Sequence, residues 1–186
     1  MAALLTSVLD NTGKVIEYTA ECQRMGIRVL PPDINASDAG FTVEGKDIRF
    51  GLLALKNVGR NLIATVVRER SGTPYRSLYD FCKRLHGTEI NRRAVESMIK
   101  SGAFDNLEAK RRSMMDGVEG ILKSVESEAR RNLDGQIDLF GALDGEQESG
   151  RNVYKLPDSG EEYPYDILLQ MEKEVSGLYL SGHPLD

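Results

Sequence analysis

The sequence predicts a mainly α-helical fold with one small β-hairpin. Apolar residues recur at three- and four-residue spacing over most of the chain, which is typical of amphipathic helices. Two short alternating stretches, 41–44 and 47–50, flank Gly45 and Lys46, where a hairpin turn is expected. The 186 residues suit one ordinary domain or two small ones, with 40% hydrophobic and 28% charged residues. This composition is that of a packed protein, and the length is too short for a multi-domain enzyme.

The first predicted helix covers residues 14–25 and ends at Gly26, which suits a left-handed C-cap. Pro31 and Pro32 then impose extended or turn backbone before the hairpin. We expect neither a secretory signal nor a membrane span, and the helix-like start suggests a piece of a longer protein.

Further helices follow the hairpin. A first helix is expected at 52–55, a second after Arg60, a third after Pro74, and a fourth capped by Asn91 and stopped at Gly102. A longer helix and a last one are expected from these apolar positions: Met114, Val118, Leu122 and Val125, then Ile167, Leu168, Met171 and Val175. Each element thereby has one apolar face to bury.

Apolar residues thin out between 126 and 162, where Asp, Glu, Gly and Asn dominate. This composition predicts a flexible acidic linker. The charge divides in the same way: residues 1–115 hold 18 Lys and Arg against 13 Asp and Glu, and residues 116–186 hold 6 against 16. The formal net charge of −5 therefore hides a basic helical block, which could face nucleic acid.

The turn between the first two expected helices of this block can hold a phosphate. Its glycine lets backbone approach a ligand, and the next helix directs free N–H groups at it. Lys56 and Arg60 add positive charge. The expected DNA contacts are Lys56, Asn57, Val58, Gly59 and Arg60. Alternatively, Gly59 only turns a corner between two packed helices.

A second basic turn, 100–105, is followed by another run of cations. Its expected DNA contacts are Lys100, Ser101, Gly102, Lys110 and Arg111. Two such hairpins resemble a tandem helix-hairpin-helix domain, which grips both strands of a duplex across the minor groove. In the alternative, this hairpin is purely structural and Phe104 plugs the core. Asn57 stands where such turns more usually carry Gly, and Asn tolerates the left-handed conformation, so we expect the turn to form.

An apolar island interrupts the acidic segment: Gln136, Ile137, Asp138, Leu139 and Phe140. Spaced apolar anchors after a polar one are typical of peptides that dock into a groove. The island resembles the pentapeptide by which bacterial polymerases and repair proteins bind the sliding clamp. The alternative is a segment folded back on its own domain.

The sequence lacks the residue patterns of the common catalytic, nucleotide-binding and metal-binding sites. No Asp-x-Asp pair supplies a two-metal carboxylate site, and no Walker or Rossmann glycine string occurs. His86 and His183 are isolated, and Cys22 and Cys82 stand far apart, which fits a reduced, cytoplasmic setting. We expect no catalytic residue, metal site or cofactor in this chain.

Several longer motifs occur together and in one order: Glu21-Cys-Gln-Arg-Met-Gly-Ile27, Leu30-Pro-Pro-Asp-Ile-Asn35, Ile48-Arg-Phe-Gly-Leu52, Ala54-Leu-Lys-Asn-Val-Gly59, Asn91-Arg-Arg93, Lys100-Ser-Gly-Ala-Phe-Asp105 and Leu178-Tyr-Leu-Ser-Gly-His-Pro184. With them the chain resembles the alpha subunit of bacterial DNA polymerase III. The resemblance implies the end of a fingers domain at 1–40 and a β-hairpin with a tandem helix-hairpin-helix domain at 41–125. It further implies a linker with the clamp motif at 126–162 and a helix leading to a further domain at 163–186.

The resemblance also implies a function: sequence-independent binding of primer–template duplex and tethering to the sliding clamp, or beta subunit, during replication. Other replicase subunits would be reached through the parent chain, a DNA-directed DNA polymerase. That family's catalytic aspartates, with their Mg²⁺, match no position here, so these residues should be inactive alone. Two alternatives remain: a helix-hairpin-helix module of a repair nuclease or ligase, and a structural connector that binds nothing.

Overall fold

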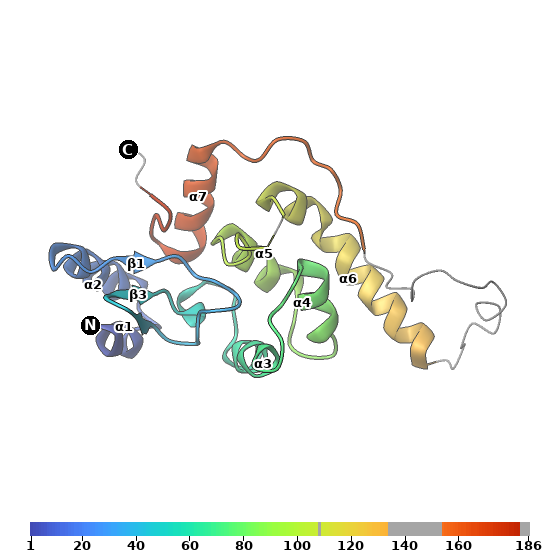
Figure 1. The fold of residues 1–186 in the computed structure, drawn as a ribbon, viewed down its shortest axis with the longest axis horizontal. Coiled ribbons are helices and arrows are strands. Elements are labelled where there is room, and N and C mark those ends of the chain that lie inside the picture. The colour runs from blue at the N-terminus through green and yellow to red at the C-terminus, as the bar shows by residue number, and fades with distance from the viewer. Residues whose placement is uncertain (108, 134–153, 183–186) are drawn as a thin grey trace.

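Helices dominate the computed structural model, which describes residues 1–107, 109–133 and 154–182 (Figure 1). A small sheet lies at the end of the molecule that holds the N-terminus, and the longest helix lies at the other. The expected mainly α fold with a β-hairpin is therefore confirmed. The proposed clamp motif at 136–140 and His183 lie outside the described residues. Among the helices that are described, none combines the length and apolar character needed to cross a membrane.

The N-terminal part pairs α1 (Ala2–Ser7) with α2 (Thr12–Arg24). Asn11 caps α2, because its side chain accepts a hydrogen bond of 3.1 Å from the backbone N–H of Lys14. The chain leaves α2 through Gly26, whose φ of 73° is easily reached only by glycine. The predicted helix and its glycine stop are confirmed, and the helix begins two residues earlier than expected.

The sheet holds the expected hairpin and one further strand. β2 (Thr42–Glu44) and β3 (Asp47–Arg49) are antiparallel, with Val43 opposite Ile48. β1 (Val29–Leu30) pairs in parallel with β3, which gives the strand order β1-β3-β2. Two residues are too few to show an alternating pattern, so the sequence does not reveal β1. The sheet buries Ile48 against the helices.

The helical part contains η1 (Leu52–Ala54), α3 (Arg60–Arg70), α4 (Leu78–Arg84), α5 (Arg92–Lys100), α6 (Arg111–Leu133) and α7 (Tyr165–Ser176). The α-helix expected at 52–55 is wrong: these residues make one 3-10 turn. Leu55 is already extended, with φ and ψ of −80° and 140°, because the chain must enter the next turn there. The other helices occur where they were expected, and Asn91 caps α5 by accepting from the N–H of Ala94.

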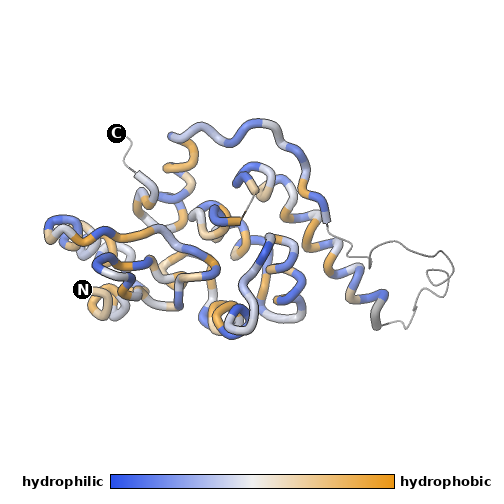
Figure 2. The backbone as a smooth tube through the Cα atoms, viewed as in Figure 1, coloured by the Kyte–Doolittle hydropathy of each residue, from blue (hydrophilic) through white to orange (hydrophobic). Residues whose placement is uncertain are grey.

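One apolar core joins these elements. Phe104 is fully buried and meets Phe81 edge to face with ring centroids 5.1 Å apart, and Phe81 meets Tyr75 in the same way at 5.0 Å. Hydrophobic and hydrophilic residues alternate along α6, as its amphipathic pattern requires (Figure 2). Its buried hydrophobic side chains are Met114, Val118, Ile121 and Val125, so that Ile121 replaces the expected Leu122, which is half-buried.

Residues 154–163, here called the strap, run back over α6 (Figure 1). The side chain of Tyr154 lies over Gly120 and stacks on Tyr79, while Leu156 and Pro157 lie over Gly117. Within the expected linker of 126–162, α6 continues to residue 133 and the strap packs on α6, so parts of this range are ordered against the helices. Composition missed the strap because its few apolar anchors, Tyr154, Leu156 and Pro157, stand in an otherwise polar stretch.

The strap explains two glycines in the middle of a helix, where glycine costs about 1 kcal/mol relative to alanine. We predict that Gly117→Ala lowers the free energy of unfolding by about 1–2 kcal/mol, because the new methyl group would meet Leu156 and lie 3.0 Å from Cδ of Pro157. Urea unfolding measures the change.

Gly13→Ala in α2 is the matched control. A methyl group there meets only Asn11 Oδ1 at 3.4 Å, so it should stabilise the protein slightly. If Gly117→Ala stabilises the protein as well, the strap does not occupy this face in solution.

Candidate nucleic-acid interface

The first hairpin turn, 56–60, stands at the surface between η1 and α3. Lys56, Asn57, Gly59 and Arg60 are exposed and Val58 is half-buried. Asn57 has a φ of 62°, the one positive value among non-glycine residues in the described ranges. The expectation that Asn would adopt the left-handed conformation here is confirmed, and the turn is formed.

The turn is held from two sides. The side-chain amide of Asn57 donates to Oγ of Ser97 in α5 over 3.1 Å. The backbone N–H of Lys56 donates to the carbonyl of Val175 in α7 over 2.9 Å. Neighbouring helices thus orient the turn, while its basic side chains stay in solvent.

Helix α3 begins at this turn with an open N-terminus. Gly59 is its N-cap and supplies no side-chain hydrogen bond to the first turn of the helix. Unsatisfied N–H groups and the helix dipole favour an anion at such a position. Two carboxylates lie nearby without capping the helix: Asp10 lies 4.0 Å from the exposed Arg60 guanidinium, and Glu89 accepts from the side chain of Asn61 and has its other oxygen 3.7 Å from where a Cβ on Gly59 would stand. A phosphate could therefore reach this end of α3.

The second turn differs, because its polar groups bond to one another. Ser101 and Gly102 are buried, and their N–H groups donate to the carbonyls of Ser97 and Ile99, each over 3.0 Å. The Ser101 hydroxyl donates to the carbonyl of Met98 over 2.8 Å. These bonds close the end of α5 and leave Ser101 and Gly102 buried, so the DNA contacts predicted at these two residues stay a prediction that the arrangement does not favour.

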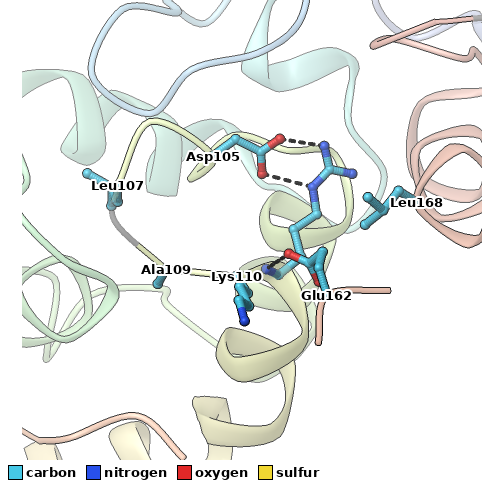
Figure 3. Close-up of a pocket in the computed structure, with 7 residues that line it drawn as sticks. Asp105, Leu107, Ala109, Lys110, Glu162 and Leu168 are labelled. Atoms are coloured by element: carbon cyan, nitrogen blue, oxygen red, sulfur yellow. Dashed lines mark hydrogen bonds and ion pairs between the residues drawn. The ribbon is translucent and has the colours of Figure 1, made fainter. Parts of the chain in front are cut away.

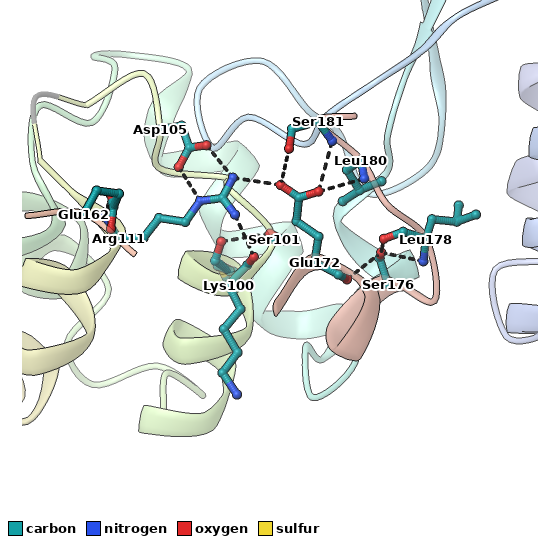
Figure 4. Close-up of polar contacts among 11 residues, drawn as sticks. Lys100, Ser101, Asp105, Arg111, Glu162, Glu172, Ser176, Leu178, Leu180 and Ser181 are labelled. Carbon is teal, nitrogen blue, oxygen red and sulfur yellow. Dashed lines mark hydrogen bonds and ion pairs between the residues drawn. The ribbon is translucent and has the colours of Figure 1, made fainter. Parts of the chain in front are cut away.

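Arg111 is also buried, with its side chain 5% exposed. Its guanidinium donates to both carboxylate oxygens of Asp105, at 2.8 and 2.6 Å, to Glu172 at 3.0 Å and to the carbonyl of Lys100 at 3.2 Å (Figure 4). Burial alone would lower the pKa of Arg111, but the bonds to Asp105 and Glu172 raise it. In this structure Arg111 is therefore a buried structural cation, and its predicted contact with DNA stays a prediction that this burial does not favour.

The N-terminus of α6 already holds an anion from the strap. The Glu162 carboxylate accepts from the N–H of Arg111 at 2.6 Å and from that of Arg112 at 3.0 Å. Lys110 is exposed and donates to the carbonyl of Gly160 over 2.7 Å. A cavity of about 450 Å³ opens beside them, where Figure 3 shows Glu162 next to Lys110. Where a phosphate would bind in the second hairpin, a side-chain carboxylate is bound.

The two hairpins thus differ: the first turn is exposed to solvent, whereas the polar groups of the second turn are bonded to partners within the chain. Sequence reasoning missed Glu162 and Glu172, which lie 50 to 61 residues from Arg111 and Arg112, whose N–H groups they accept from, beyond the reach of local capping patterns. Within the described ranges, no cluster of three or more His, Cys, Asp or Glu side chains is arranged to hold a metal ion. Burial raises the pKa of the Cys82 thiol to about 12, so it is unreactive in the folded protein.

Comparison with known proteins gives consistent results. Residues 26–114 match a family model described as a helix-hairpin-helix motif. The chain is 45% identical to DNA polymerase III subunit alpha of Saccharopolyspora erythraea, 39% to that of Escherichia coli K12 and 39% to that of Mycobacterium leprae. Each comparison covers 100% of this chain but 16% of the relative.

Because Arg111 and Glu172 form a buried ion pair, we predict that loss of Glu172 destabilises the protein far more than loss of the nearby Glu174. Glu172→Ala leaves the Arg111 charge without one of its partners and leaves the N–H groups of Leu180 and Ser181 unbonded, which should cost about 3–5 kcal/mol. Glu174→Ala, two residues further along α7, removes only an exposed pair with Lys100 and should cost less than about 1 kcal/mol. Denaturant unfolding of both variants compares the two; equal losses would contradict the assigned role of Glu172.

Proposed function

The chain is related over its whole length to one segment of the DNA polymerase III alpha subunit, and from this premise we propose that it holds duplex DNA for a replicative polymerase. The observation that carries the proposal is the first hairpin turn: exposed, basic, braced by α5 and α7, and placed before an uncapped helix N-terminus. This turn lies within the residues that match the helix-hairpin-helix family.

The resemblance stated from sequence motifs is confirmed by these matches, which favour a polymerase over a repair nuclease or ligase. The chain spans 16% of the length of these relatives. In our proposal it contributes binding, whereas nucleotidyl transfer and its Mg²⁺ belong to parts of the polymerase that the match does not cover. A connector that binds no DNA is the competing outcome of the test below.

The geometry suits contact with the DNA backbone and not with bases. Backbone N–H groups at a helix N-terminus and flexible cations bind phosphates whatever the base sequence. The first hairpin supplies both. At the second hairpin Glu162 holds the corresponding place, so we propose a one-sided grip in place of two equivalent hairpins, with Lys110 at its periphery.

We predict salt-dependent, sequence-independent binding of a labelled duplex. With three to five phosphates neutralised, the logarithm of the affinity should fall with that of the salt concentration at a slope of about −3 to −4.5. Replacing Lys56 and Arg60 together by Gln should weaken binding and bring the slope closer to zero by about 1.8, since two phosphate contacts are lost. Fluorescence anisotropy over a salt series measures both quantities.

Lys123 and Arg130 of α6, replaced together by Gln, form the matched control. Both side chains are exposed and are paired with Glu119 and Glu126. Their replacement removes the same two positive charges as the Lys56 and Arg60 variant. If the wild-type chain binds duplex without dependence on salt, or does not bind it, the proposal fails.

We further propose that residues 136–140 bind the sliding clamp, and that other replicase subunits are reached through the same parent chain. The support is the order of residues, with Gln136 followed by the apolar Ile137, Leu139 and Phe140 in an acidic setting. Apolar anchors on a polar segment gain about 1.5–3 kcal/mol each when a groove buries them. A tether of this kind raises the local concentration of polymerase at the clamp.

Leu139→Ala combined with Phe140→Ala should abolish calorimetrically detectable binding to the clamp, because both apolar anchors are removed. The urea unfolding curve should not change. Leu143→Ala, just outside the motif, is the control and should bind as the wild type does. An unchanged affinity in the double variant would rule out this tether.

A further inference from the structure

A polar cavity of about 310 Å³ lies where the first hairpin turn meets α5 and α7. Six side chains from the three elements line it: Asn57, Arg93, Glu96, Ser97, Lys100 and Glu174. Of these residues, Asn57 and Lys100 belong to two separate turns of the sequence, and Arg93 belongs to neither turn. The structure brings them to one place.

One face of α5 forms the floor of this cavity. Arg93, Ser97 and Lys100 follow one another at i, i+4 and i+7, so they share a face of the helix. The bond from Asn57 to Ser97 fixes that face against the first turn. The basic surface that begins at Lys56 therefore continues along α5.

The charges of the cavity are not equally available. Glu96 is engaged by Arg92 at 2.6 Å, on the neighbouring side of the helix. Glu174 is engaged by Lys100 at 2.8 Å. Arg93 is exposed, and in the part of the chain that the structure describes no carboxylate lies within ion-pair distance of it. The cavity thus contains one free guanidinium and one lysine shared with a carboxylate.

We propose that this cavity binds a second phosphate of the duplex backbone, with Arg93 as its main ligand, next to the phosphate at the start of α3. The proposal rests on the proposed function and names a DNA contact that the hairpin turns alone do not supply. A guanidinium presents paired N–H donors that match phosphate oxygens. Glu174 restrains binding here, because it holds Lys100 and repels the phosphate.

The first test removes the free cation. Arg93→Gln should lower the affinity for duplex about 5- to 10-fold and bring the salt slope closer to zero by about 0.9, the loss of one phosphate contact. The matched control is Arg68→Gln, an exposed arginine at the far end of α3 that carries the same charge. The control should change the affinity less than about twofold.

The second test removes the restraint. Glu174→Gln releases Lys100 from its ion pair, so the affinity should rise about threefold and the slope should steepen. A cavity with only a structural role would give no gain. Circular dichroism and urea midpoints establish that the variants are folded.

The outcomes separate this inference from the proposed function. Suppose that the Lys56 and Arg60 variant loses affinity for duplex while Arg93→Gln and Arg68→Gln have equal affinities. This result would overturn phosphate binding in the cavity and leave the first hairpin as the DNA site. No gain from Glu174→Gln would likewise overturn the binding of phosphate at Lys100. A wild-type chain that does not bind duplex overturns both proposals.

Discussion

The guanidinium of Arg111 sits where the second turn, α6, α7 and the segment after α7 meet. A buried charge is tolerated only when its donors are bonded, so the positions of Asp105 and Glu172 are constrained together with it. Glu172 in turn binds the N–H groups that follow α7. Because the carbonyl of Val175 in α7 accepts from Lys56, the placement of the first turn also depends on this buried pair.

The acidic C-terminal part of the chain is therefore a set of ligands for the basic part. Glu162 binds the start of α6, Glu172 binds Arg111 and Glu174 binds Lys100, all across more than 45 residues. These carboxylates are bonded to the polar groups around the second hairpin turn, whereas the basic side chains of the first turn stay exposed to solvent. The surroundings of the two basic turns thus differ, and the net charge of −5 says little about the surface that would meet DNA.

The features that sequence reasoning found are those determined within a few residues: the cap at Asn91, the left-handed glycine at 26 and the turn at Asn57. Apolar spacing found the helices because burial of one face is itself periodic. The strap and β1 depend on partners far along the chain, which no local pattern encodes. The burial of Arg111 could not be foreseen, because a run of three cations does not reveal which of them the helix turns inward.

The strap has a consequence for the order of folding. Its hydrogen bonds to α6 join residues 43 to 51 positions apart, whereas those of the second turn join close neighbours. The entropy lost on closing a loop grows with its length, so contacts of the second kind form first. The local bonds of the second turn are therefore expected to form before those of the strap, and Gly117 and Gly120 leave the face of α6 on which the strap packs free of side chains.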